Sequence, residues 1–144
     1  MKTIAAAFLL LSVGAPAMRP LHAAPAVALM KENADELDLA ATKSLFDNHS
    51  VCFVDARSEF AYYTSHIKGA RSLSDSRFDE QFQEFREKTP KTTPIVVYCI
   101  SSTCSKAQHV AEKLKINGYS NVRIFTGGMS EWSRARFPIE VEQD

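Results

Sequence analysis

The chain has 144 residues and a formal net charge of zero, with 45% hydrophobic and 24% charged residues. This length suits one domain with a single hydrophobic core, and the composition is that of an ordinary globular chain rather than a disordered or membrane-embedded one. The balanced charge gives no electrostatic reason to expect binding to nucleic acid or to an anionic membrane surface.

The first 24 residues have the layout of a secretory signal peptide. Lys2 supplies a positive charge, an apolar run follows over residues 4–17, and a more polar stretch then offers alanines to a signal peptidase. We expect cleavage near Ala23 or Ala24. The apolar run is short for a membrane-spanning helix, and a retained N-terminal anchor is the alternative.

The rest of the chain is interpreted as a flexible leader over residues 25–35 and one folded domain over residues 36–144. Loss of the signal peptide removes two positive charges and leaves a slightly acidic mature chain without a membrane segment. Its expected destination is an oxidising compartment, most simply a bacterial periplasm.

Short apolar runs alternate with helical patterns along the folded domain. Strand-like stretches include Leu37 and Leu39, residues 51–56, a few residues after Gly69, residues 92–99 and residues 122–126. Helical spacing is found after Ala41, at the start of 59–73, and over 75–89, 105–121 and 129–135. This alternation predicts an α/β fold: an open, mostly parallel, five-stranded sheet with helices on both faces.

Two segments qualify as the working site of such a sheet, because functional residues lie outside the carboxyl ends of its strands. The strand at 51–54 leads into the residues Asp-Ala-Arg-Ser-Glu, and the strand at 94–98 leads into Cys99.

The segment YCISSTCSK, residues 98–106, joins a strand to a helical pattern. Such a loop leaves several backbone N–H groups without helical partners, and these groups and the helix dipole stabilise an anion. Cys99 is therefore expected to favour its thiolate form, which is the nucleophile. The alternative is a buried cysteine that acts as a small hydrophobic residue.

Two longer stretches resemble the signatures of rhodanese-like domains. Residues 53–73 contain Asp-x-Arg after a strand and, later, His-Ile-x-Gly-Ala. Residues 96–132 contain a cysteine at a strand end, a six-residue loop, a helix, Gly-Tyr-x-Asn-Val and Gly-Gly-x-x-x-Trp. The motifs occur in the right order, and the resemblance spans roughly residues 36–137.

The resemblance implies sulfur transfer without a cofactor or a metal. The loop cysteine of the family takes a sulfane sulfur from thiosulfate or a persulfide donor, and it passes the sulfur to a thiol or to cyanide. By position, Cys99 matches the persulfide carrier. Asp55 and Arg57 match the pair that helps to organise the site, Glu59 lies near the loop mouth, and His66 matches a histidine with a structural role.

The loop departs from two related patterns. Rhodanese-like phosphatases and arsenate reductases close a Cys-x5-Arg loop with an arginine that clamps an oxyanion, whereas Ser105 stands at this position here. Sulfurtransferase loops of the family often carry a glycine and a cation where this chain has Ser102 and Cys104. Because this loop lacks the usual cation, efficient thiosulfate turnover does not follow from the resemblance alone. Lys106 lies just beyond the loop and could replace the cation.

The predicted site has catalytic, binding and structural members. Cys99 and Cys104 are predicted to be catalytic, and Asp55 and His66 to be structural. The predicted substrate-binding residues are Ile100, Ser101, Ser102, Thr103, Ser105, Arg57, Glu59 and Lys106. The loop hydroxyls are expected to act as donors, and their small side chains to let the chain curl around the sulfur.

Cys104 has four interpretations. It could be a resolving thiol that attacks a persulfide on Cys99, half of a resting disulfide, a metal ligand with Cys99 and His109, or a half-buried small residue. A disulfide requires the two Cα atoms to lie within about 7 Å of each other. Cys52 lies in an apolar strand and is expected to be inert core.

Three functions remain as hypotheses. The first is a sulfurtransferase with Cys99 as carrier. The second is a thiol–disulfide or persulfide redox protein that uses Cys99 and Cys104, with a periplasmic thiol reductant as partner. The third is a non-catalytic binding module.

Overall fold

The computed structural model describes residues 35–142, so the predicted signal peptide and almost all of the predicted leader lie outside the described residues. The strands are β1 (Glu36–Leu37), β2 (Cys52–Asp55), β3 (His66–Ile67), β4 (Arg71–Ser72), β5 (Ile95–Tyr98), β6 (Val122–Phe125) and β7 (Ile139–Glu140). The helices are α1 (Leu39–Asp47), α2 (Glu59–Thr64), α3 (Phe78–Lys88), α4 (Lys106–Ile116) and α5 (Gly128–Arg134), with a short 3-10 helix η1 (Asp75–Arg77).

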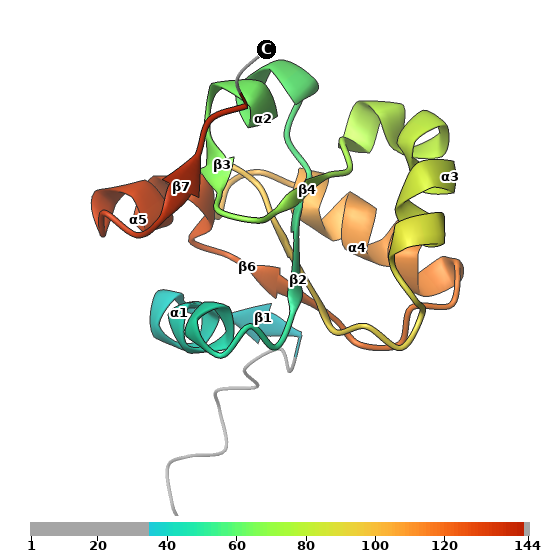
Figure 1. The fold of residues 1–144 in the computed structure, drawn as a ribbon, viewed down its shortest axis with the longest axis horizontal. Coiled ribbons are helices and arrows are strands. Elements are labelled where there is room, and N and C mark those ends of the chain that lie inside the picture. The colour runs from blue at the N-terminus through green and yellow to red at the C-terminus, as the bar shows by residue number, and fades with distance from the viewer. Residues whose placement is uncertain (1–34, 143–144) are drawn as a thin grey trace, which may run out of the picture. The chain divides into compact units, whose positions relative to one another are not determined.

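The main sheet has five strands in the order β1-β6-β5-β2-β4, and each neighbouring pair runs parallel (Figure 1). The two central strands pair with Val54 opposite Val97 and Asp55 opposite Tyr98. All four residues are fully buried, as expected for strands covered on both faces. The predicted α/β fold with a five-stranded parallel sheet is confirmed.

Two apolar layers hold helices against the sheet. On one face α3 and α4 pack on a cluster that includes Ile95 and Val97, and on the other α1 and α5 pack on a cluster that includes Val96 and Trp132 (Figure 1). Successive residues of β5 thus point to opposite layers, which is the period-two alternation of a strand. Each fully buried valine or isoleucine contributes roughly 1.5–3 kcal/mol relative to exposure.

Capping side chains define where the first two helices begin. Asp38 accepts a hydrogen bond from Ala41 N at 2.7 Å, and Ser58 accepts one from Ala61 N at 3.3 Å. The strand spacing predicted for Leu37 and Leu39 is therefore wrong at its second member: Leu39 is the first residue of α1. An aspartate at the N-cap stabilises a helix by about 1 kcal/mol, which outweighs a two-residue strand pattern.

A second, two-stranded sheet was not predicted. β3 and β7 pair antiparallel, with His66 opposite Glu140 and Ile67 opposite Ile139. Strands of two residues have no periodicity to detect, and their pairing joins segments that are far apart in the chain. α4 ends at Ile116, before the end of the helical pattern predicted over 105–121, because Gly118 follows it with φ +95°, a conformation suited to glycine.

Over residues 35–142 no helix combines the length and the apolar character that a membrane crossing requires.

Candidate active site

The ends of β2 and β5 meet at one edge of the main sheet. Ala56 N donates to Tyr98 O at 2.9 Å, so the two backbone segments stay paired one residue beyond the end of β2. Asp55 and Arg57 therefore lie beside the start of the loop that begins at Cys99, as the parallel topology predicts.

A buried hydrogen-bond network lies at the end of β2. Asp55 is fully buried and accepts hydrogen bonds from Arg57 N at 3.0 Å, from Arg57 Nη2 at 2.7 Å and from Tyr98 Oη at 2.8 Å. Tyr98 Oη in turn accepts a hydrogen bond from Ile67 N at 3.1 Å. Burial and the Asp55 charge raise the pKa of Tyr98 above its ordinary value, so the hydroxyl stays a donor.

The guanidinium of Arg57 is engaged in the scaffold. Its Nη2 also donates to Ser65 O at 2.6 Å and to Ala61 O at 3.4 Å, at the carboxyl end of α2. Burial alone would lower the pKa of Arg57, but the hydrogen bond and the charge of Asp55 outweigh burial and raise it. Arg57 thus joins β2, α2 and Asp55 as a permanent cation, and its substrate contact remains a prediction.

Two further predicted binding residues lie on helices beside this edge. Glu59 accepts a hydrogen bond from Gln81 Nε2 at 2.8 Å and forms an ion pair with Arg77, so it connects α2 to η1 and α3. Lys106 is the exposed first residue of α4. Neither placement tests a contact with substrate.

Cys99 is 3% exposed, and its backbone is hydrogen-bonded to the first turn of α5. The carbonyl oxygens of Cys99 and Ile100 accept hydrogen bonds from Met129 N and Ser130 N, each at 2.9 Å. Gly128 allows this close approach. It has φ +58°, and a Cβ atom there would lie 2.6 Å from Cys99 O.

Sequence reasoning missed this support. The motif Gly-Gly-x-x-x-Trp includes Gly127 and Gly128, but the sequence did not identify this pair as the backbone on which the cysteine loop rests. The signal was the Gly-Gly pair itself, since consecutive glycines also mark places where two backbones come very close.

The loop turns back on itself through Ser101–Cys104. Cys104 N donates to Ser101 O at 3.1 Å, and the hydroxyls of Ser101 and Thr103 lie 3.0 Å apart in a hydrogen bond. The predicted curl of the small residues is present, but these two hydroxyls pair with each other. Ile100, Ser102, Thr103 and Ser105 are exposed, and Ser101 is half-buried.

This turn places Cys104 on Cys99. The two residues form a disulfide, with their Cα atoms 6.2 Å apart. Of the four interpretations of Cys104, the structure thus corresponds to the one in which Cys104 is half of a disulfide. Within residues 35–142 no group of three or more His, Cys, Asp or Glu side chains is arranged to hold a metal ion.

The remaining cysteine lies in β2. Cys52 is free and half-buried rather than fully enclosed, and it packs against the α3–α4 face of the sheet. Burial raises the pKa of its thiol, which disfavours the reactive thiolate.

His66 lies in β3 and is 2% exposed. Its ring stacks on Tyr62 with centroids 3.9 Å apart, its Nδ1 lies 2.9 Å from Tyr62 O, and its Nε2 lies 3.6 Å from a carboxylate oxygen of Glu140. These contacts tie α2 to the β3–β7 sheet. The structural role assigned to His66 stays a prediction.

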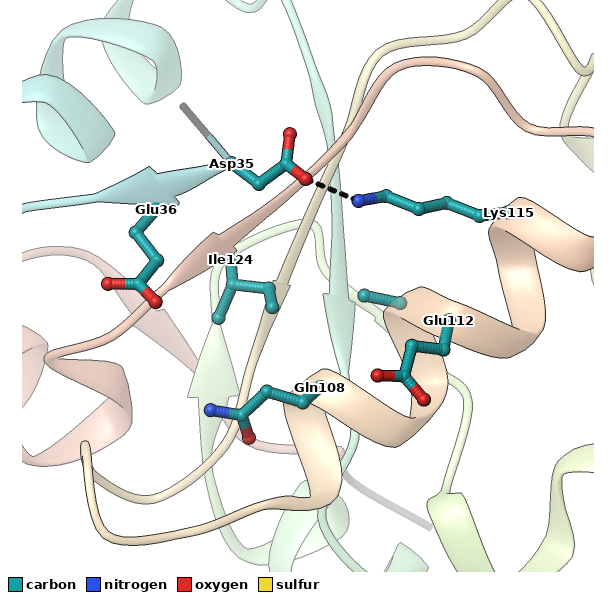
Figure 2. Close-up of a pocket in the computed structure, with 7 residues that line it drawn as sticks. Asp35, Glu36, Gln108, Glu112, Lys115 and Ile124 are labelled. Carbon is teal, nitrogen blue, oxygen red and sulfur yellow. Dashed lines mark hydrogen bonds and ion pairs between the residues drawn. The ribbon is translucent and has the colours of Figure 1, made fainter. Parts of the chain in front are cut away.

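A pocket of about 290 Å³ lies between β1 and α4 (Figure 2). Asp35 and Lys115 form an ion pair at 2.6 Å across one side of it. On the other side, the side-chain amide of Gln108 lies 3.1 Å from the carbonyl oxygens of Cys104 and Ser105, to which its nitrogen can donate. This pocket therefore adjoins the backbone behind the loop, and Cys99 is not among its lining residues.

A larger pocket, of about 680 Å³, lies beside β4 between α2 and α3. Glu59 and Arg77 line it together with Arg71 and Glu84, so its charges are mixed. Cys99 is absent from its lining as well.

Comparisons with known proteins agree with this geometry. A family model described as the rhodanese-like domain matches residues 38–135. A thiosulfate sulfurtransferase, GlpE, of Haemophilus influenzae is 36% identical over 88 residues, which cover 61% of this chain and 78% of that protein.

Two solved structures share the fold. The BH2092 protein from Bacillus halodurans has a TM-score of 0.68 at 25% identity, over 78% of this chain and 80% of that one. A variant of EanB, described as a cysteine persulfide in a tetrahedral intermediate state with ergothioneine, has a TM-score of 0.64 at 25% identity, over 74% of this chain and 28% of that one.

Proposed function

Because the chain belongs to the rhodanese-like domain family, we propose that it is a sulfurtransferase in which Cys99 carries the transferred sulfur as a persulfide. The observation that supports this most directly is the position of Cys99. It lies at the carboxyl end of the central strand β5, at the start of the loop that leads into α4. A solved neighbour at 25% identity, EanB, is itself described as a cysteine persulfide.

The proposed reaction needs only sulfur chemistry. The Cys99 thiolate attacks the sulfane sulfur of the donor, the S–S or S–SO₃ bond of the donor breaks, and the remainder leaves with the electron pair. A thiol or cyanide then attacks the outer sulfur of the persulfide, and Cys99 returns as a thiolate.

The charges of the site favour a persulfide donor over thiosulfate. Residues 100–105 include no cation, and the guanidinium of Arg57 is paired with buried Asp55. Thiosulfate carries two negative charges and needs a compensating cation, whereas a persulfide anion carries one. Lys106 is the cation next in sequence to the loop, and its exposure lets water screen its charge.

The test uses reduced protein, a sulfur donor and cyanide. Wild-type protein should form thiocyanate faster from glutathione persulfide than from thiosulfate, and Cys104→Ser, which has no second loop thiol, should gain the mass of one sulfur atom on Cys99. Cys99→Ser should fall to the background rate. Cys52→Ala, which changes a thiol outside the loop, should keep the wild-type rate. Absence of thiocyanate from both wild type and Cys104→Ser, together with absence of the mass gain in Cys104→Ser, would overturn the proposal.

The Cys99–Cys104 disulfide supports a second candidate, a thiol–disulfide redox protein that transfers electrons and no sulfur. Both candidates gain two thiols when this disulfide is reduced, so the presence or absence of a Cys99 persulfide distinguishes them. The redox candidate requires two additional thiols after reduction and no persulfide on Cys99 with any sulfur donor. It fails if Cys104→Ser leaves the redox behaviour unchanged.

We further propose that the mature protein is periplasmic after removal of residues 1–24. The support is the sequence pattern described above, and an oxidising compartment with a thiol reductant would suit a reversible disulfide. The mass of the protein purified from the periplasmic fraction tests this: it should lack the N-terminal segment. A full-length mass in that fraction, or recovery only from the cytoplasm, would contradict it.

A further inference from the structure

The pairing of Cys99 with Cys104 gives the site a route for releasing sulfur without an external acceptor. We propose that Cys104 is a resolving thiol: it displaces the outer sulfur of a Cys99 persulfide as hydrosulfide and leaves the Cys99–Cys104 disulfide. This inference rests on the proposed function, because it begins from the Cys99 persulfide.

The loop holds the backbone of Cys99 in place and brings Cys104 next to it. The backbone of Cys99 is held by Met129 N, and the adjoining strand end is held by Ala56 N. Cys104 is brought back by the turn that starts at Ser101, and its Cα lies 6.2 Å from that of Cys99. The Cys104 sulfur is thus within bonding reach of the atom that would carry the persulfide.

Burial makes this internal thiol a better attacker than one from solution. Cys99 is 3% exposed, whereas Cys104 is half-buried and lies between the exposed residues Thr103 and Ser105. In the disulfide-bonded form Cys99 is nearly enclosed, and Cys104 Sγ is the atom bonded to its sulfur. Intramolecular groups in such positions act at effective concentrations far above those of free thiols.

The chemical step is balanced within the protein. The Cys104 thiolate attacks Cys99 Sγ, a new Sγ–Sγ bond forms, and the bond between Cys99 Sγ and the outer sulfur breaks. The outer sulfur leaves with that electron pair as hydrosulfide. The sulfane sulfur is reduced to sulfide, and the two cysteine thiols are oxidised to the disulfide.

Return to the starting state requires a dithiol as reductant. The difference in exposure indicates where it attacks: Cys104 Sγ belongs to the more exposed residue, and Cys99 then leaves as the thiolate. The second thiol of the reductant resolves the mixed disulfide on Cys104. The reductant ends as a disulfide, and both cysteines are reduced again.

The experiment follows a single turnover without oxygen. Full-length protein is reduced with dithiothreitol, freed of reductant and mixed with a stoichiometric amount of glutathione persulfide. Hydrosulfide, protein mass and alkylatable thiols are then measured over time. Wild-type protein should release hydrosulfide and lose the thiols of Cys99 and Cys104 together, with Cys52 the only thiol left to alkylate.

Two variants make the outcome decisive. Cys104→Ser should gain the mass of one sulfur, keep it, and release hydrosulfide at least about 100-fold more slowly. Cys52→Ala should behave as wild type, apart from its missing thiol. Dithiothreitol should restore the wild-type protein for a second turnover.

Failure of this inference can be told apart from failure of the proposed function. If Cys104→Ser gains no sulfur, Cys99 is not a persulfide carrier, and both fall. If Cys104→Ser and wild type both hold a stable persulfide, the sulfurtransferase proposal stands and the resolving role of Cys104 is wrong. Hydrosulfide release at equal rates from both proteins would have the same meaning.

Discussion

The carboxyl ends of β2 and β5 are neighbours in the sheet, yet they are built in opposite ways. At the end of β2, Asp55 and Arg57 are buried, charged and joined to each other, and Asp55 is joined to Tyr98, by hydrogen bonds of 2.7–3.2 Å. Beyond β5, the side chains of residues 100–105 are uncharged and mostly exposed, and the contact that closes the loop is a disulfide.

The two strand ends therefore serve different purposes. The charges of Asp55 and Arg57 at the end of β2 neutralise each other and hold β2 and α2 together. The loop after β5 contains Cys99 and Cys104, and its backbone accepts hydrogen bonds from α5. Changes after β2 should therefore cost mainly stability, whereas changes under the β5 loop should also alter the reactivity of Cys99.

The largest effect is expected from Arg57→Leu. This change leaves the carboxylate of Asp55 buried without its cation, and breaking a buried pair in this way costs about 3–5 kcal/mol. Urea unfolding followed by circular dichroism should show this loss. The control is Arg77→Leu, since Arg77 forms solvent-exposed ion pairs with Glu59 and Glu80. If both variants lose the same stability, the contrast between the buried and exposed pairs is wrong.

A smaller effect is expected from Gly128→Ala, which should destabilise the protein by about 2–4 kcal/mol through backbone strain and a clash with Cys99 O. Gly69→Ala is a matched control. Gly69 has φ +76°, but an added Cβ there meets nothing within 4 Å, so about 1–2 kcal/mol of backbone strain remains.

The two glycine variants also separate stability from reactivity. Alkylation of Cys99 in the reduced protein should change rate in Gly128→Ala and stay at the wild-type rate in Gly69→Ala. Equal alkylation rates in the two variants would show that α5 does not position the loop.

The smallest effect concerns Asp75, an acid of the scaffold with partners on α4. Burial raises the pKa of Asp75, but hydrogen bonds from His109 and Lys113 outweigh it and lower the pKa below the ordinary 3.8. A lowered folded-state pKa stabilises the protein above the unfolded value, and the contribution is lost as the pH falls through the folded value. Since His109 and Lys113 are about half exposed, solvent screening keeps the contribution below about 1 kcal/mol.

Thermal melts of wild type and Asp75→Asn test this from about pH 7 down to about pH 2. The variant should melt at a lower temperature near neutrality, and the two melting temperatures should converge at the acid end. A difference that persists unchanged at the lowest pH would exclude the carboxylate charge as its source.

Much of the fold could be predicted because its signals are local. The apolar run at β5, the spacing of Phe78, Phe82 and Phe85 in α3, and Gly118 after α4 each report on their own neighbourhood. The alternation of strands and helices then restricted the topology to a parallel sheet. The position of Cys99 after β5 followed from the same pattern.

What the sequence did not reveal depends on contacts between distant segments. The pairing of β3 with β7 joins residues 66–67 to 139–140, and the support of Cys99 O by Met129 N crosses thirty positions of the chain. Neither leaves a periodic trace. The disulfide was one of four possibilities for Cys104, because only the turn at Ser101 decides whether the sulfurs can meet.

The Cys99–Cys104 bond joins residues only five positions apart. A crosslink restricts the unfolded chain by the entropy of the ring that it closes, and a ring this small is worth about 2 kcal/mol, less than one that spans a whole domain. Opening it therefore removes only a modest part of the restriction on the unfolded ensemble. We therefore expect the fold to be the same in both oxidation states of the loop, so that the bond is broken and remade without unfolding the domain.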